Sequence, residues 1–186
     1  MNQYLSLAIN KFKSDKTVDM NLSLEDFICS SYVNSPPCSY GTNIAERLRK
    51  ELNETLTVDR VSPSLNLGDY KVLSKYFEVK VSFLSSRNNS YNITHIRQWQ
   101  RFNYYLICFI DCENDFTPNY YVIDKHIINK FRLTPMNGTP LSNSGNFNIE
   151  MRTTVKNNSE QIRILKNSNL LRDTSLQSLK SFLHNL

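Results

Sequence analysis

Apolar positions in the first part of the chain recur at helical spacing. Segments 2–13, 23–32 and 42–55 each carry an apolar side chain at about every third or fourth residue, which is the period of one helix face. The run Ser35-Pro36-Pro37 interrupts this pattern before the third segment. The sequence therefore predicts three helices before the middle of the chain.

The period then changes to one that is typical of strands. Segments 57–61, 67–72 and 76–84 are rich in Val, Tyr, Phe and Leu. The last two are close enough in sequence to form a hairpin through residues 71–75. A polar stretch at 85–92 ends this part of the predicted sheet.

The second half of the chain mixes both patterns. Segment 94–104 returns to a helical period, whereas the apolar run 104–112 predicts a buried strand and 120–123 a short one. A loop rich in Asn, Gly, Ser and Pro is expected at 133–148. The alternation at 149–155 then predicts one more strand.

Two helices are expected at the C-terminal end. One begins near Ser159, and the closing helix follows Thr174, which is expected to cap it. The order of elements predicts an α/β fold class of the mixed α+β kind, with a central mixed β-sheet flanked by helices. A chain of 186 residues is expected to form a single domain, 1–186.

The charge of the chain favours a polyanionic partner. Lys and Arg number 22 against 17 Asp and Glu, so the net charge is +5. Many proteins carry such a charge without binding nucleic acid, so charge alone does not identify the partner. The apolar run 104–110 is far shorter than the ~20 residues of a membrane helix, and residues 1–13 lack the apolar core of a signal peptide. The sequence therefore predicts a cytoplasmic protein with no membrane partner.

Charged side chains interrupt the apolar pattern of segment 76–84. Alternation places Glu78 and Lys80 on one face of this strand, and pairing of the hairpin would bring Asp69 beside Glu78. Two carboxylates ~4 Å apart repel by roughly 4 kcal/mol at an effective dielectric of about 20, and a cation between them would relieve that repulsion. Oxygen ligands without His or Cys favour Mg²⁺ or Mn²⁺, and Lys80 can orient or deprotonate a water for attack on phosphorus.

This pattern resembles the PD-(D/E)xK nuclease superfamily, whose signature is an acid on one strand and an acid-x-lysine on the next. Asp69 matches the first acid, and Glu78-Val79-Lys80 matches the second element. The resemblance implies a restriction-endonuclease-like core at about 40–130, catalytic Asp69, Glu78 and Lys80, and the two acids as metal ligands. A strand that carries Glu-x-Lys on a solvated face is the alternative interpretation.

Two positions near this signature extend or depart from the resemblance. The superfamily often has a preceding helix that donates a Glu to the metal site, and Glu46 occupies that place, with Glu51 as the rival. The alternative role of Glu46 is to form a capping box with Asn43. Gly68 departs from the family, which often has proline before the first acid.

Downstream, Gln100-x-x-x-Tyr104 matches a motif found in the helix after the catalytic strand in several branches of the superfamily. On a helix, Gln100 would point into the packed face, where the metal site or the backbone would have to supply its hydrogen bonds. The resemblance therefore implies supporting roles for Gln100 and Tyr104.

The same region offers candidate contacts with DNA phosphates. These are Arg87, Arg97 and Arg101, for which a solvated basic face is the alternative. His95 is expected to be a polar residue at a helix start, and Trp99 is expected in the core.

In size and order of elements the chain resembles the small catalytic subunits of heterodimeric type IIS restriction endonucleases, including the group that reads GAGTC. In these enzymes a large subunit recognises the site and cuts one strand, and the small subunit cuts the other. The resemblance implies Mg²⁺-dependent hydrolysis of a phosphodiester of double-stranded DNA in a bacterial cytoplasm, with the large subunit as partner. The first two helices and the region after Phe131 are the expected docking surfaces. A self-sufficient homodimeric restriction or repair nuclease and a non-catalytic DNA-binding or scaffolding module remain as alternatives.

Overall fold

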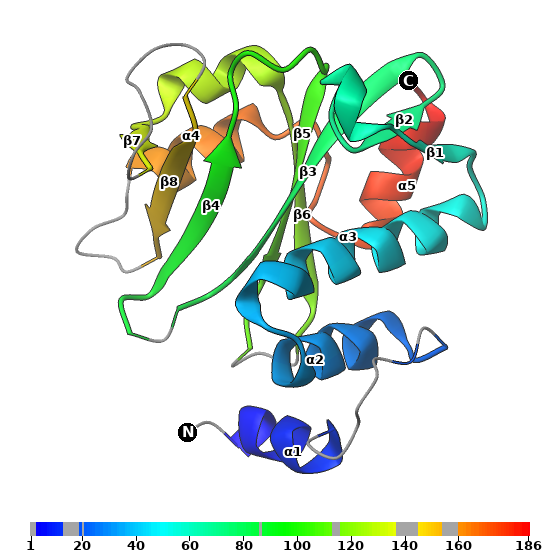
Figure 1. The fold of residues 1–186 in the computed structure, drawn as a ribbon, viewed down its shortest axis with the longest axis vertical. Helices are drawn as coiled ribbons and strands as arrows, with labels where there is room; N and C mark the ends of the chain where they lie inside the picture. Colours follow the sequence, from blue (N-terminus) through cyan, green and yellow to red (C-terminus); the bar gives the residue numbers. More distant parts are fainter. Residues whose placement is uncertain are drawn as a thin grey trace.

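Two β-sheets and the helices packed around them build the fold (Figure 1). The computed structural model describes residues 3–12, 19, 21–85, 87–112, 116–136, 145–153 and 160–186. The larger sheet contains both parallel and antiparallel pairs and is flanked by helices, which confirms the predicted fold class. Within the described ranges, no helix is long and apolar enough to cross a membrane.

The larger sheet has its strands in the order β1-β2-β3-β5-β6. These strands are β1 (Val58–Arg60), β2 (Tyr70–Val72), β3 (Lys75–Phe83), β5 (Tyr104–Ile110) and β6 (Pro118–Asp124). β3 and β5 are parallel, and the other neighbouring pairs in this sheet are antiparallel. The predicted hairpin is confirmed, because Val72 pairs with Lys75 across its turn.

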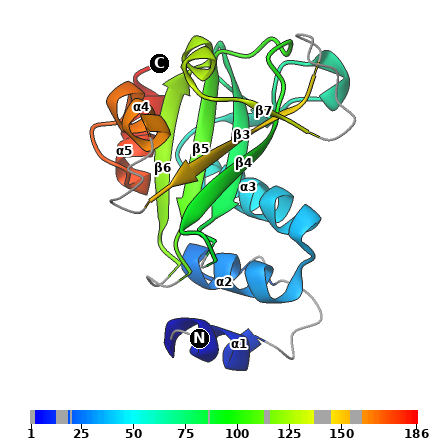
Figure 2. The same ribbon diagram turned by 90° about the vertical axis from the view of Figure 1, so that its left-hand side faces the viewer.

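The second sheet lies in front of the first in Figure 2 and has the order β4-β8-β7. Its strands are β4 (Ser90–Ile96), β7 (Thr134–Pro135) and β8 (Phe147–Arg152). Because β4 follows β3 in the chain, the connection between the parallel strands β3 and β5 runs through this second sheet. Residues 154–155 of the predicted last strand and 137–144 of the predicted loop lie outside the described residues.

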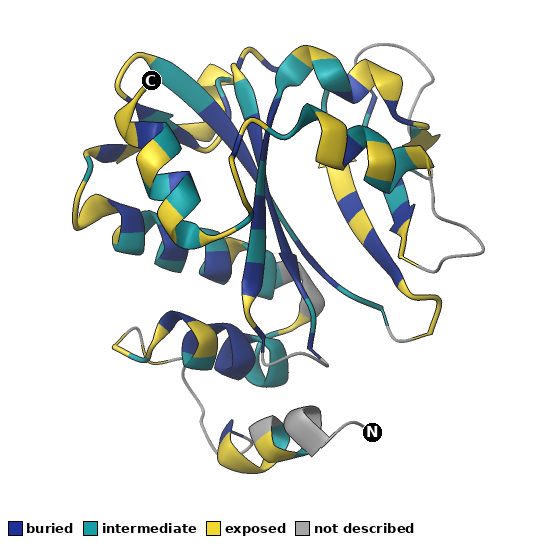
Figure 3. Cartoon of the chain, turned by 180° about the vertical axis from the view of Figure 1, so that it is seen from behind, coloured by how far each residue is buried: buried dark blue, intermediate teal, exposed yellow. Residues whose placement is uncertain are grey.

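Helices complete two apolar cores, one on each face of the larger sheet. The helical elements are α1 (Gln3–Phe12), α2 (Leu24–Asn34), α3 (Pro37–Asn53), α4 (Glu160–Ser168), α5 (Leu176–His184) and the 3₁₀ turns η1 (Pro63–Leu65) and η2 (Lys125–Lys130). α2, α3 and α5 pack against one face, whereas α4 and the second sheet cover the other. Figure 3 shows the buried positions running along β3, β5 and β6.

The helix predicted at 94–104 is wrong, because this segment holds the end of β4 and a loop. Tyr91 and Ile93 are buried at strand spacing, but the pairing with β8 shifts before Ile96. His95 in this bulge has a φ of 56°, and the extra residue puts buried Ile96 three positions after Ile93. A bulged strand thus imitates the spacing of a helix.

Two helix starts also differ from the prediction. α3 begins at Pro37, because the fixed φ of proline suits the first position of a helix. Ser175, and not Thr174, caps α5. The Thr174 hydroxyl instead donates to Oδ1 of Asn119 on β6 at 2.7 Å.

Candidate active site

The acidic site forms where the chain enters β2 and runs along the edge of β3. The Asp69 N–H donates to the Phe77 carbonyl at 2.8 Å, and Asp69 Oδ2 accepts from the Val79 N–H, also at 2.8 Å. At this edge of β3 the carboxylate therefore accepts a backbone hydrogen bond that a neighbouring strand would otherwise accept. It is held against the backbone between Glu78 and Lys80.

Glu78 and Lys80 share the face of β3 that is turned toward the second sheet. Phe77 and Val79 belong to the opposite core beneath α3, which confirms the predicted alternation. Glu78 is only 5% exposed, and its Oε1 lies 2.6 Å from Lys80 Nζ. A buried carboxylate and its ammonium partner thus lie beside the exposed carboxylate of Asp69.

The electrostatics of the site reflect this crowding. Burial raises the pKa of the Glu78 carboxyl, the Lys80 ammonium lowers it, and the charge of Asp69 raises it again. The net direction is upward, since the lost hydration outweighs the attraction of the ammonium. The charge of Asp69 therefore acts on the Glu78 carboxyl.

Asp69 and Glu78 offer oxygen donors that suit a hard cation. Among the described residues, no group of three or more His, Cys, Asp or Glu side chains is arranged to hold a metal. Mg²⁺ commonly takes one or two carboxylates and completes its coordination with waters and substrate phosphates. The repulsion that Asp69 exerts on Glu78 also fits a cation between them. The two carboxylates are therefore a donor set that fits Mg²⁺.

The structure does not bring a third carboxylate from α3 to this pair. Glu46 Oε1 lies 2.8 Å from Arg49 Nη2, and this guanidinium lowers the pKa of Glu46. Glu51 is held by Arg47 at 2.7 Å and by Lys180 at 3.6 Å. Both candidate glutamates thus serve ion pairs on a helix that packs against the opposite face of the sheet.

The expected helical motif of Gln100 and Tyr104 is also corrected. Gln100 lies in the loop after β4, where it is buried, and its Oε1 has no partner within the described chain. The ring of Tyr104 packs 5.3 Å from that of Phe77, on the face away from Glu78. Tyr104 therefore cannot support the acidic pair directly.

Tyr105 is a neighbour of the site that sequence reasoning missed. It is the register partner of Glu78 on parallel β5, and its buried hydroxyl has no hydrogen-bond partner among the described residues. Burial first, and the charge of Glu78 second, raise the pKa of Tyr105. Only the pairing of β3 with β5 identifies this contact, and hydropathy does not reveal which strands pair.

The three candidate arginines lie in different places. Arg97 is near the site, because its charge lowers the pKa of Glu78. Arg101 is exposed, and its N–H donates to the carbonyl of Asn66 at 2.7 Å, just before the acidic site. Arg87 is exposed in the turn after β3, at the end away from β2.

Two further side chains depart from their predicted environments. His95 is exposed in the bulge of β4, where burial and then the charges of Lys80 and Arg97 lower its pKa. It therefore lies in a strand bulge and not at a helix start. Trp99 is 41% exposed, so its predicted place in the core is wrong.

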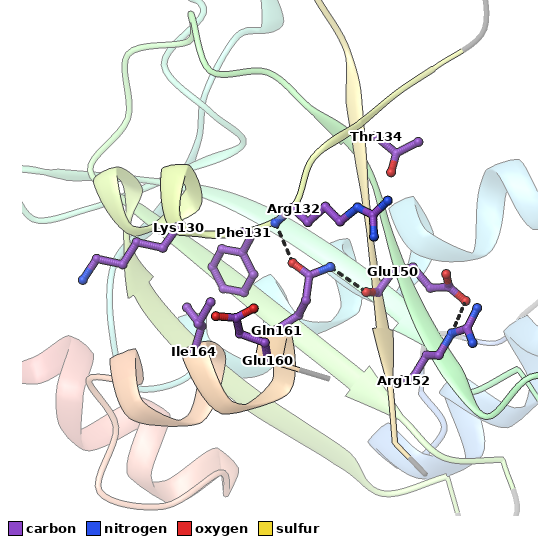
Figure 4. A pocket seen from close by; sticks show the side chains of 9 residues that line it. All are labelled: Lys130, Phe131, Arg132, Thr134, Glu150, Arg152, Glu160, Gln161 and Ile164. Atoms are coloured by element: carbon purple, nitrogen blue, oxygen red, sulfur yellow. Dashed lines mark hydrogen bonds and ion pairs between the residues drawn. The ribbon is translucent and has the colours of Figure 1, made fainter. Parts of the chain in front are cut away.

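A separate pocket of about 770 Å³ lies between η2, the second sheet and α4 (Figure 4). Its lining consists of Lys130, Phe131, Arg132, Thr134, Glu150, Arg152, Glu160, Gln161 and Ile164. The side chain of Gln161 bridges the Arg132 N–H and the Glu150 carbonyl, and Glu150 pairs with Arg152 at 3.3 Å. The pocket shares no residue with the acidic site.

Gly68 sets the approach of Asp69 to β3. Its φ is +88°, and a Cβ there would lie 2.6 Å from the Phe77 carbonyl oxygen. Proline, which fixes φ near −65°, cannot adopt this conformation, so the departure from the family pattern has a physical reason. We expect Gly68→Ala to lower the free energy of unfolding by about 1–3 kcal/mol.

Urea denaturation checks this expectation, with Gly41→Ala as the matched control. A Cβ at Gly41 in α3 would meet nothing within 4 Å, so this change should stabilise the protein by about 0.5–1 kcal/mol. Equal stability of the two variants would contradict the close approach at Gly68.

The raised pKa of Glu78 predicts a pH dependence of stability. The folded protein holds the Glu78 proton more tightly than the unfolded chain does. The free energy of unfolding should therefore fall as the pH rises from about 4.5 through the raised pKa, and Glu78→Gln should remove this part of the slope. Urea titrations across this range measure the slope, and the exposed Glu160 offers Glu160→Gln as a control that should keep it. A wild-type slope in Glu78→Gln would refute the burial argument.

A comparison with models of known protein families and a comparison with curated proteins both find no match for this chain.

Proposed function

We propose that this chain is a Mg²⁺-dependent endonuclease that hydrolyses a phosphodiester bond in one strand of double-stranded DNA. The observation that carries the proposal is the hydrogen bond from the Val79 N–H to Asp69 Oδ2 at 2.8 Å. This bond holds the carboxylate of Asp69 beside the buried pair of Glu78 and Lys80. An acid next to an acid-x-lysine strand is the signature arrangement of the PD-(D/E)xK nucleases that the sequence resembles.

The side chains of the acidic site would have different roles in the reaction. Asp69 is exposed and Glu78 is buried, so the first can meet the substrate while the second stays fixed. Together they would hold Mg²⁺, or Mn²⁺ in its place, which when bound polarises a phosphate oxygen and lowers the pKa of a coordinated water. Lys80 carries three N–H donors, of which one serves Glu78, so the others can orient a water or a phosphate oxygen.

Basic residues beside the site favour DNA as the substrate. Arg97 acts on the acidic site, and Arg101 lies in the loop bonded to the chain just before Asp69. Both would contact phosphates on either side of a cut, whereas Arg87 would touch only a longer duplex. Because these contacts are to phosphates, binding should weaken strongly as salt increases.

We further propose that the chain works as the small catalytic subunit of a heterodimeric type IIS restriction enzyme. Its moderate net charge of +5 supports weak binding that a large recognition subunit would have to strengthen. α1, α2, α4 and α5 contribute no residue to the acidic site, which leaves these helices available for docking this partner.

Plasmid cleavage in Mg²⁺ tests both parts of the proposal. The purified chain alone should cut supercoiled DNA poorly, and addition of the large subunit should produce breaks at a fixed distance from its site. Efficient double-strand cutting by the chain alone would favour the homodimeric nuclease. No cutting under either condition, with the partner shown to bind, would favour a non-catalytic scaffold.

A further inference from the structure

A second pocket, of about 350 Å³, lies between the loop after β4 and the 3₁₀ turn η2. Its lining consists of Gln98, Trp99, Lys125, His126, Ile128 and Asn129. The volume falls near the lower end of ligand pockets, roughly 300–1,000 Å³, so it suits one ring system and not a large ligand. Trp99 is the only tryptophan of the chain and keeps 41% of its surface exposed.

One turn connects this pocket to the acidic site. The Gln100 N–H donates to the Arg97 carbonyl at 3.3 Å, so residues 97–100 form a closed turn. Arg97 at its start acts on Glu78, whereas Trp99 lines the pocket. The Lys125 ammonium donates to the Gln100 carbonyl and fixes the far side of the turn. The turn that carries the indole is therefore fixed by hydrogen bonds, and it begins at a residue whose charge acts on Glu78.

The chemistry of the pocket favours a nucleobase. None of its six lining residues is acidic, and Lys125 and His126 can face a polyanion. Gln98 Nε2 donates to Asn129 Oδ1 at 2.7 Å, which leaves Gln98 Oε1 and Asn129 Nδ2 to face the edge of a base. An exposed indole beside such amides offers a stacking surface for a base ring.

We propose that Trp99 stacks on a nucleobase that is displaced from the duplex next to the cut. Bases inside a duplex are covered on both faces by their neighbours, so an indole can stack only on a base that is unpaired or flipped out. This inference rests on the proposed nuclease function, because it takes DNA as the ligand of the neighbouring site. It adds a subsite that selects locally distorted DNA.

Fluorescence of the single tryptophan tests the proposal without any cleavage step. The full chain is titrated in Ca²⁺ with three DNA hairpins that are fully paired, carry one unpaired base, or carry an abasic position there. The unpaired base should quench Trp99 emission and bind most tightly. Equal quenching of Trp99 emission by all three hairpins, or no quenching by any of them, would overturn base stacking and favour another partner for this surface.

Variants measured by anisotropy of labelled DNA give a second readout. Trp99→Ala should lower the affinity for the unpaired-base hairpin about tenfold and leave the paired hairpin nearly unchanged. Trp99→Phe should keep most of the preference, and Leu170→Ala, at another exposed apolar residue, should keep all of it. An equal loss on paired and unpaired DNA would overturn the proposal.

The outcome stays separate from that of the nuclease proposal. Quenching by the unpaired base, together with no cleavage in Mg²⁺ when the large subunit is bound, would support the subsite and overturn the nuclease. Cleavage together with unchanged Trp99 emission would support the nuclease and overturn the subsite.

Discussion

Glu78→Gln should abolish cleavage of DNA in Mg²⁺ in the presence of the recognition subunit. The variant keeps the shape of a side chain that is 5% exposed, but it removes a charged oxygen donor of the proposed cation site. A loss of about 4 kcal/mol of transition-state stabilisation lowers the rate about 1,000-fold. Asp69→Asn should have a similar effect, because the other carboxylate alone holds Mg²⁺ weakly. Initial rates of plasmid nicking measure both losses.

Glu160→Gln provides the matched control for these variants. Glu160 is exposed on α4, away from the acidic site, so the Glu160→Gln variant should cleave DNA at the wild-type rate. Circular dichroism should show that all three variants remain folded. A folded Glu78→Gln protein that cleaves at the wild-type rate would remove Glu78 from the mechanism.

Replacing Mg²⁺ by Ca²⁺ should be nearly as damaging to cleavage, although Ca²⁺ should still bind. Ca²⁺ accepts more ligands in looser geometry, and we expect it to acidify its bound water less than the smaller ion does. The exposed carboxylate of Asp69 can adapt to either ion, so DNA binding should survive the exchange. Cleavage rates and DNA affinity measured in parallel separate these effects.

Equal turnover in Mg²⁺ and Ca²⁺ would contradict the proposed role of the cation. Mn²⁺ should support cleavage, because it accepts the same oxygen donors as Mg²⁺. Loss of DNA binding in Ca²⁺ would show that the cation acts on DNA binding and not on the chemical step.

The sequence predicted the acidic strand pair because alternation is a local property. Glu78 and Lys80 share a face wherever the strand lies. The short turn after Val72 nearly determines that the segment carrying Asp69 lies next to the strand that carries Glu78. The closing helix was predicted for the same reason, since its apolar face depends on a period within one element.

The errors arose where distant parts of the chain decide the outcome. The bulge at His95 depends on pairing with β8, more than 50 residues away. It gives the apolar residues of a strand the spacing of a helix. That error placed Gln100 and Tyr104 on one helix face and Trp99 in the core. The role of Tyr105 beside Glu78 depends on the parallel pairing of β3 and β5, which no local pattern specifies.

Crystals of the chain grown with Mn²⁺ and duplex DNA would show whether Asp69 and Glu78 hold the cation. Anomalous scattering locates Mn²⁺ without any assumption about the reaction. We expect a Mn²⁺ peak between the carboxylates of Asp69 and Glu78 that disappears in Glu78→Gln. No peak at these carboxylates, or Mn²⁺ bound only elsewhere, for example near Glu150 and Glu160, would contradict it.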